Sequence, residues 1–490
     1  MIQRKNITAP ILILSLALQL FLFAYTAYNS YGYDDEYFNI NNVESYTSLY
    51  ELASDHLSGR FVDVHPLGQC LINYILLKAF GSWNLVRVIG ALIAALSLWL
   101  YWRYLVAEKL SDGWSILFAY VFMCINPTVL LWCTSVRWYT YFLPLVCVIG
   151  MLLSSPKALT TRKYLFWAVY FITVSLMFYL ESSSAIMIIT SFILLLIQHR
   201  KALKEEYKAI LCFGVLSLAF VSRQIYLFLT VLYPSVKGSG EFYSLAASFV
   251  GGGHNFLSSH AVMPLSVPGI MLIAANFLLF IVFIINIKAV SSSWPNKFFI
   301  LSYAGKILAR IAGKVRNFVG LTAPFGGFMA DVFSRIRNKT LKIAILALYL
   351  AGTSWGIYNV VAHTDTTRGT WNTPYAEILE FIADYNREDY IVLSHNPVFD
   401  YHAEQLGFNT ADSLWDTDCY EKLAAHKGPA IILKTYKGSL TDDDYAKFNA
   451  YIDSKKVILS KKFGYDKFAA FKRRMDKNYP DYYAEILVCE

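Results

Sequence analysis

Long apolar runs, most of them closed by basic residues, fill the first 360 positions of the chain. The first run lies between Lys5 and Asp34 and contains no charged side chain. A helix needs about 20 apolar residues to cross a bilayer. Further runs near that length occupy 84–102, 114–133, 138–154, 164–180, 182–198, 209–232, 269–288 and 341–360. The pattern predicts a polytopic α-helical membrane protein with about nine or more spans.

Three segments allow more than one interpretation. The apolar segment from Leu67 to Phe80 is short for a span, so we expect an interfacial or re-entrant helix there. The segment 291–340 spaces its basic residues among aromatics and glycines, which favours amphipathic helices on an anionic membrane surface, although two extra spans would also fit. A cleaved signal peptide is the alternative for the first run, but its length and the spans that follow favour a membrane helix.

Basic residues predict the orientation of the spans, because cytoplasmic loops are enriched in Lys and Arg. The clusters around 103–109, 157–163, 200–208 and 288–342 alternate with less basic loops, so we expect them in the cytoplasm. The loop 29–66, the turns at Arg137 and Glu181, and the segment 233–268 then face outside. Within that last segment, Gly251 to Asn255 is expected to be a flexible loop.

The chain changes character near its C-terminal quarter. The 490 residues are 56% hydrophobic, and residues 1–360 carry a net charge of +13, whereas residues 361–490 carry −5. The pattern of apolar and polar residues in 361–490 predicts helices at 376–385 and 442–454 and strands at 390–394, 430–435 and 457–459. We therefore expect a transmembrane domain over 1–360 and a soluble extracytoplasmic α/β domain over 365–490. Cys419 and Cys489 would share that oxidising compartment and could pair there.

The loop 29–66 gathers seven carboxylates against a single basic residue. A solvated acidic loop is one interpretation. Position favours another, because Asp34, Asp35 and Glu36 directly follow a membrane helix, and Asp63 and His65 directly precede an apolar helix. Carboxylates beside a low-dielectric bilayer are costly unless they meet a cation, a metal or a proton. We therefore expect chemistry at this loop.

Two arginines at outer helix ends run against the positive-inside trend. Arg87 and Arg137 could be attracted to lipid phosphates. They could also clamp a phosphate leaving group, for which guanidinium geometry is suited, and the apolar surroundings of Arg137 favour this second interpretation. Glu181 is an isolated acid between two apolar runs, so it is either a functional group or the cap of the next helix.

These motifs, taken in order, resemble the polyprenyl-phosphate-sugar-dependent membrane glycosyltransferases of the protein O-mannosyltransferase and lipid A aminoarabinose transferase superfamily. The matching elements are the pair Asp35-Glu36, the stretch Asp63-Val64-His65-Pro66-Leu67-Gly68 with one proline missing, the helix-entry Arg87, and Asn126-Pro127 followed by Arg137-Trp138-Tyr139. Many relatives have a histidine where this chain has Glu181. The resemblance covers roughly residues 1–200.

The resemblance implies a GT-C fold and inverting transfer of a sugar from a polyprenyl-phosphate donor to an acceptor hydroxyl on the outer face of a bacterial inner membrane. Asp35 would be the general base, with Glu36 beside it in the catalytic pair. Arg87, Arg137 and Tyr139 would bind the donor phosphate. The acceptor would be positioned by Asp34, Asp63, His65 and Glu181, or a divalent metal ion would be held by Asp35 and Asp63.

The remaining partners are a lipid, glycan or protein acceptor and membrane lipids, and no nucleic acid is expected. One alternative function is a lipid-linked sugar transporter or flippase. Such proteins tend to show inverted repeats and acids in the middle of helices, and neither pattern is present in this sequence. A second alternative is a scaffold whose C-terminal domain binds a partner, which would give the acidic loop and the outer arginines no role.

Overall fold

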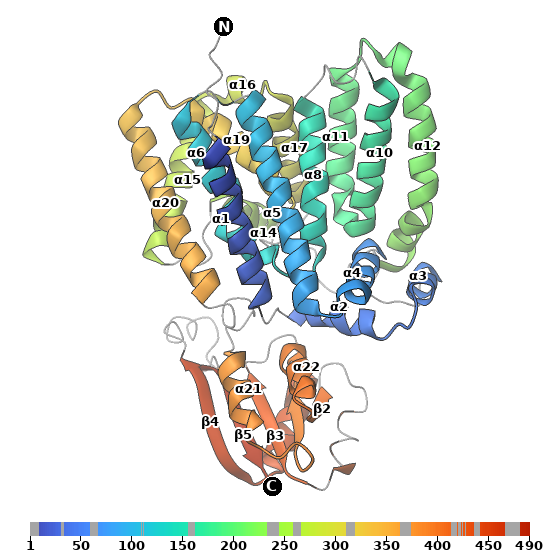
Figure 1. Ribbon diagram of the computed structural model, residues 1–490, viewed down its shortest axis with the longest axis vertical. Coiled ribbons are helices and arrows are strands. Elements are labelled where there is room, and N and C mark those ends of the chain that lie inside the picture. Colours follow the sequence, from blue (N-terminus) through green and yellow to red (C-terminus); the bar gives the residue numbers. More distant parts are fainter. Residues whose placement is uncertain are drawn as a thin grey trace. The chain divides into compact units, whose positions relative to one another are not determined.

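The computed structural model describes residues 9–30, 34–58, 67–108, 110, 112–154, 162–232, 245–257, 266–309, 319–362, 374–412, 419, 423, 425–426, 428–435, 442–465 and 481–490. The chain divides into two compact units (Figure 1). Unit 1 comprises Met1–Tyr28 and Val43–Val361, and unit 2 comprises Asn29–Asn42 and Ala362–Glu490.

Unit 1 is a helical bundle in which seven described segments are long and apolar enough to cross a membrane. These are α1 (Ala9–Tyr28), α5 (Trp83–Glu108), α6 (Gly113–Met123) with α7 (Pro127–Trp132), α10 (Lys163–Leu180), α12 (Leu203–Leu227) continuing into the π-helix η2 (Phe228–Leu232), α15 (Val267–Ile285) and α20 (Lys339–Ala362). Each coincides with an apolar run of the sequence. The prediction of a polytopic helical membrane protein is confirmed.

Shorter helices complete the bundle. The predicted runs at 138–154 and 182–198 form α8 (Trp138–Ser154) and the 3-10 turn η1 (Ser182–Ser184) with α11 (Ala185–Gln198). The short apolar segment forms α4 (Leu67–Phe80), which lies next to α3 (Leu49–Ser58) at the end of the bundle where α5 begins (Figure 1). We call this the Arg87 end, and the opposite end, where α5 finishes, the Arg335 end.

Two expectations need correction, a flexible loop at 251–255 and surface helices throughout 291–340. Gly251 to Asn255 lie inside a helix, α14 (Leu245–Leu257), because the flanking apolar residues continue a helical pattern across the glycines. The segment 291–340 contains α17 (Trp294–Leu308) and α19 (Thr322–Ser334), preceded by α16 (Ile287–Val290). Most of α19 is buried against α6, α8 and α17, so it is a core helix rather than a surface one.

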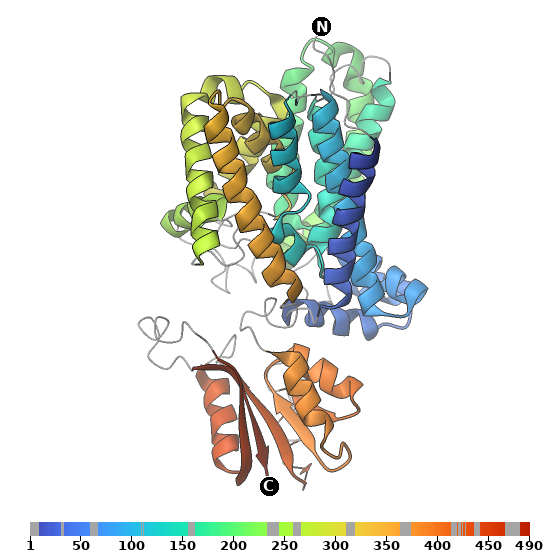
Figure 2. The ribbon, with the colours of Figure 1, turned by 60° about the vertical axis from the view of Figure 1, so that its left-hand side comes forward.

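Glycines allow close helix contacts that fix the order of the bundle. Gly90 of α5 lies against Thr140 of α8, and Gly150 of α8 lies against Tyr101 of α5. From the first contact to the second, the residue number rises along both helices, from 90 to 101 on α5 and from 140 to 150 on α8. The two helices therefore run parallel. Gly352 packs in the same way against Leu272, which joins α20 to α15 (Figure 2).

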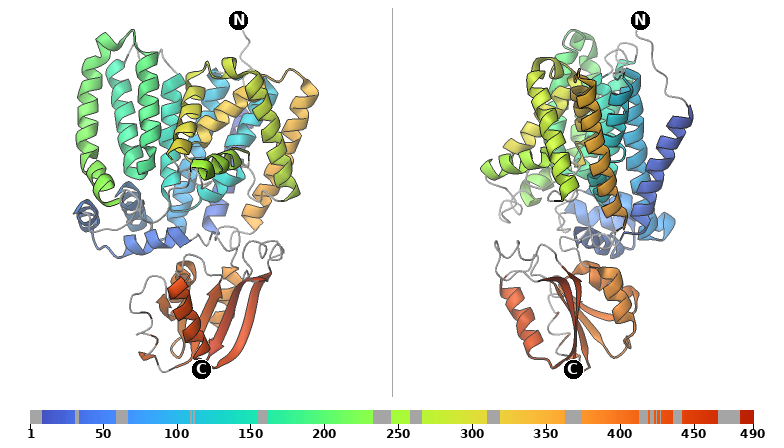
Figure 3. Two further views of the ribbon diagram at one scale, coloured as in Figure 1. Left: turned by 180° about the vertical axis from the view of Figure 1, so that it is seen from behind. Right: turned by 90° about the vertical axis from the view of Figure 1, so that its left-hand side faces the viewer.

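Unit 2 is built on a five-stranded mixed sheet with strand order β2-β1-β3-β5-β4. Its strands are β1 (Ile391–Ser394), β2 (Asn409–Asp412), β3 (Ala430–Thr435), β4 (Val457–Tyr465) and β5 (Tyr482–Cys489), and its helices include α21 (Tyr375–Ala383), α22 (Pro397–Gln405) and α24 (Asp442–Asp453). β1 pairs in parallel with β2 and β3, and β5 pairs antiparallel with β3 and β4. Figure 3 shows α24 on one face and α21 and α22 on the other. The predicted soluble C-terminal α/β domain is confirmed.

The segment after the first span packs with the C-terminal residues in this unit. It forms the start of α2 (Asp34–Glu44), where Tyr37 is fully buried. The hydroxyl of Tyr37 lies 2.7 Å from Nε2 of His402 on α22, and its ring lies 5.0 Å from that of Tyr401. Cys419 and Cys489 both lie in one core of this unit and are not joined by a disulfide.

We expect Gly68→Ala to destabilise the protein by about 1–3 kcal/mol, because the new methyl group would overpack a rigid contact. It would lie 2.7 Å from the carbonyl oxygen of Tyr179, which belongs to the backbone of α10. The matched control is Gly113→Ala, where a methyl group meets nothing within 4 Å. Thermal unfolding in detergent should show a lower midpoint for the first variant alone, and equal midpoints would contradict the close contact.

His56 of α3 provides a pH-dependent prediction. Burial lowers the pKa of His56 to about 4. In the unfolded chain this imidazole takes up a proton near pH 6.5, whereas in the folded protein it stays neutral down to about pH 4. The free energy of unfolding therefore falls by up to about 3 kcal/mol as the pH is lowered from roughly 6.5 to 4. His56→Leu should flatten that slope in thermal unfolding, whereas replacement of the exposed His254 should not. An unchanged slope in His56→Leu would contradict the assignment.

Candidate functional site

Arg87 lies in the second turn of α5 and is buried, with 3% of its surface exposed. Its Nη1 donates a hydrogen bond of 2.9 Å to Oδ1 of Asn84, one turn earlier on the same helix. A guanidinium stays charged in proteins, so this position holds a permanent positive charge inside an apolar bundle.

Arg137 lies in the bend between α7 and α8 and is buried to the same extent. Two amide side chains of α4 hold this bend. Val136 accepts hydrogen bonds at its carbonyl from Asn73 Nδ2 at 3.0 Å and from Gln69 Nε2 at 3.3 Å. The backbone N–H of Trp138 donates to Gln69 Oε1 at 3.1 Å. The residues on both sides of Arg137 are therefore fixed to α4.

Helix geometry brings the two arginines to the same level of the bundle. Gly90 on α5 contacts Thr140 on α8, and the two helices run parallel. Arg87 and Arg137 each precede that contact by three residues, so both lie at the Arg87 end. The structure thus places these two residues, which were predicted as phosphate ligands, at the same end of the bundle, Arg87 near the start of α5 and Arg137 in the bend just before α8.

The predicted Asn-Pro element has a structural role. Asn126 is the N-cap of α7, where its Oδ1 accepts from the backbone N–H groups of Thr128 and Val129, and Pro127 occupies the first helical position. Tyr139 is buried among aromatic rings, 4.6 Å from Trp138 and 5.9 Å from Trp132 between centroids. Both elements therefore shape the backbone around Arg137.

Glu181 follows α10 and caps η1, since its Oε1 accepts from the backbone N–H of Ser183 at 2.9 Å. The alternative interpretation as a helix cap is therefore observed. Tyr179, two residues earlier, contacts Gly68 at the start of α4, so Glu181 also lies at the Arg87 end. Lys306 of α17 interacts electrostatically with Glu181.

The acidic residues after the first span are described in part. Asp34 and Asp35 lie in the first turn of α2, but their side chains lie outside the described part of the chain. Glu36 of the same turn is buried in unit 2. Asp63 and His65 also lie outside the described residues. Among the residues that the structure does describe, no group of three His, Cys, Asp or Glu side chains could hold a metal ion, so a metal at Asp35 and Asp63 stays a prediction.

The structure adds two residues that the sequence analysis missed. Gln69 and Asn73 stand four positions apart, so they share one face of α4, and both are fully buried. Two amides at this spacing in an otherwise apolar segment are a signal that could have been used. Tyr141 of α8 extends the network, because its hydroxyl donates to Asn73 Oδ1 at 2.9 Å.

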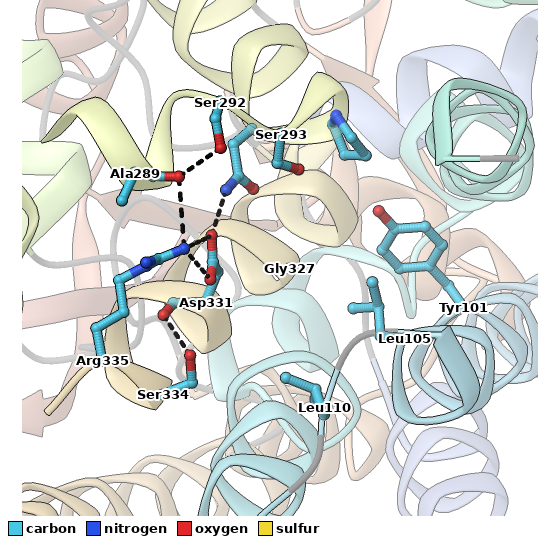
Figure 4. Close-up of a pocket in the computed structure, with 12 residues that line it drawn as sticks. Tyr101, Leu105, Leu110, Ala289, Ser292, Ser293, Gly327, Asp331, Ser334 and Arg335 are labelled. Atoms are coloured by element: carbon cyan, nitrogen blue, oxygen red, sulfur yellow. Dashed lines mark hydrogen bonds and ion pairs between the residues drawn. The ribbon is translucent and has the colours of Figure 1, made fainter. Parts of the chain in front are cut away.

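A cavity of about 230 Å³ lies at the Arg335 end, away from these residues. Asp331 stands on one side of it, where it accepts from Asn296 Nδ2 at 2.8 Å and pairs with Arg335 at 3.1 Å. Tyr101 and Leu105 stand on the other side (Figure 4). None of the predicted site residues lines it.

Comparisons with known proteins support the fold. No protein-family model and no curated protein matches the sequence. Among solved structures, ArnT from Cupriavidus metallidurans bound to undecaprenyl phosphate is similar at a TM-score of 0.53 with 9% identity, and its apo state at 0.56 with 10%, each covering 98% of both chains. ArnT is a lipid A aminoarabinose transferase of the GT-C fold. The chain is an integral membrane protein with this fold, as its resemblance to the superfamily predicted.

Removal of the hydrogen bonds that Asn73 of α4 makes should loosen the bend that carries Arg137. Asn73→Leu removes the amide oxygen that accepts from the Tyr141 hydroxyl and the Nδ2 donor to the Val136 carbonyl, which together should cost about 2–4 kcal/mol. Tyr141→Phe removes one donor and should cost about 1 kcal/mol. Unfolding in detergent distinguishes the two, and equal effects would show that Asn73 does not hold the bend.

Proposed function

We propose that this protein transfers a sugar, with inversion, from a polyprenyl-phosphate donor to an acceptor hydroxyl on the outer face of a bacterial inner membrane. The observation that carries the proposal is the pair of buried arginines, Arg87 and Arg137, at one end of a GT-C fold. The similar ArnT structure is described as bound to undecaprenyl phosphate. Two fixed guanidinium groups suit a phosphate that gains charge as it leaves.

The reaction needs a base and a stabilised leaving group. Asp35 takes the proton of the acceptor hydroxyl as its oxygen attacks the anomeric carbon. The bond between that carbon and the phosphate oxygen breaks, and its electron pair leaves with the polyprenyl phosphate. Arg87 and Arg137 neutralise this charge where it develops, and Tyr139 lines the same bend. Glu36, Asp63 and His65 position the acceptor.

Buried arginines also favour this function over a scaffold. A charged side chain inside a membrane unit costs several kcal/mol unless it is matched by a ligand or a counter-charge. A scaffold needs no pair of buried guanidinium groups at one end of its bundle, whereas a transferase that binds a lipid phosphate does. For a flippase, we expect donor binding without bond breaking. The soluble domain of unit 2 is proposed to recognise the acceptor, which is a lipid, a glycan or a protein.

Asp35→Asn tests the assignment of the base. With purified protein and a panel of radiolabelled polyprenyl-phosphate sugars, wild type should release polyprenyl phosphate and label an acceptor. The variant should transfer at least about 100-fold more slowly, because a positioned base contributes at least that factor. It should still bind the donor.

The matched control is Glu51→Gln, an exposed carboxylate of the same acidic segment, which should keep wild-type turnover. Donor binding by wild type without any transfer would favour the flippase. Equal turnover in Asp35→Asn and wild type would remove Asp35 from the mechanism.

A further inference from the structure

Lys306 is a buried cation that the proposed mechanism does not use. It lies near the end of α17, and 1% of its surface is exposed. A buried ammonium is costly, and ionisable groups inside membrane units tend to mark binding sites or charge pathways. Among the described lysines of unit 1, Lys342 is the other buried one, and it pairs with Asp112 at 3.4 Å near the Arg335 end.

Packing brings Lys306 to the turn that follows α10. Its neighbour Gly305 lies so close to Ile186 that a methyl group there would meet the Ile186 side chain at 2.6 Å. Ile186 is in the first turn of α11, directly after η1. The electrostatic interaction between Lys306 and Glu181 agrees with this placement. Because Glu181 lies at the Arg87 end, Lys306 does too.

Three serine hydroxyls on the two segments that meet at this contact are buried and make no hydrogen bond in the structure. They are Ser182 and Ser184 on η1 and Ser302 on α17. Ser302 precedes Lys306 by four residues, so both share one face of α17. A buried hydroxyl without a partner costs about 1–3 kcal/mol, and three of them on the segments that meet beside one buried ammonium point to an acceptor-rich ligand.

We propose that Lys306 and these three hydroxyls form an anion site for the phosphate of the lipid-linked donor. A phosphate offers several acceptor oxygens and a negative charge, which match one ammonium and three hydroxyl donors. Glu181 serves as the counter-ion of Lys306 while the site is empty, instead of positioning the acceptor or a metal. This inference rests on the proposed function and adds a third cation to Arg87 and Arg137.

The test measures binding of polyprenyl phosphate to the full chain in nanodiscs of zwitterionic lipid. Lys306→Met should weaken binding at least about tenfold, because charge-assisted hydrogen bonds are lost. Lys306→Arg should recover part of the affinity. Unphosphorylated polyprenol should bind wild type and Lys306→Met equally weakly. Competition by inorganic phosphate at concentrations near those of the lipid would instead identify a site for the free ion, and would overturn the lipid assignment.

The matched control is Lys342→Met, which removes the other buried lysine and should leave affinity unchanged. Glu181→Gln should bind as tightly as wild type or more tightly, whereas a residue that positions the acceptor would lower transfer alone. The double variant with Lys306→Met and Glu181→Gln removes both charges, so that neither is left buried without its counter-ion. It therefore controls for misfolding of the single variant. We expect it to keep the wild-type unfolding midpoint and still bind weakly.

The two proposals fail in different ways. If wild type does not bind polyprenyl phosphate, the proposed function fails. If wild type binds and either Lys306→Met or the double variant binds as tightly, the anion site fails while the proposed function stands.

Discussion

Positive charge held inside an apolar helical bundle is the constraint on which the rest of this structure depends. Arg87 and Arg137 are almost fully buried, and Lys306 is buried at the same end of the bundle. Moving such an ion out of water costs several kcal/mol even after the protein relaxes. That cost is comparable to the whole net stability of a typical domain. The same end of the bundle carries buried amides, Gln69 and Asn73, on a helix that is too short to cross the membrane.

That short helix explains the arrangement of the Arg87 end. α4 approaches α10 through Gly68 and holds the bend before α8 through Gln69 and Asn73. The bend exists because α7 starts at a fixed point, the Asn126 cap, and ends before α8 begins. Parallel packing of α5 and α8 then brings Arg87 to the same level. Each feature is local, yet together they place two arginines at the same end of the bundle.

The sequence predicted the membrane helices well, because apolar length alone identifies them. It also singled out Arg87 and Arg137 as candidates, since charges at the predicted outer helix ends break a general trend. It could not predict that Gln69 and Asn73 hold the bend, because hydrogen bonds across 60 or more positions depend on tertiary packing. Lys306 carried no signal among the many basic residues of 291–340. In unit 2 the strands β2 and β5 and helix α22 were missed, because short elements have weak patterns that the sheet itself stabilises.

The central claim is that the Arg87 end binds the lipid phosphate, and photoaffinity labelling tests it most directly. A polyprenyl phosphate analogue with a photoreactive group beside the phosphate would be cross-linked to the intact protein, and the labelled peptides identified by mass spectrometry. The account predicts labels on α4, the first turns of α5 and α8, and the turn at Glu181. Labels confined to the cavity lined by Asp331 and Arg335, at the opposite end, would contradict it.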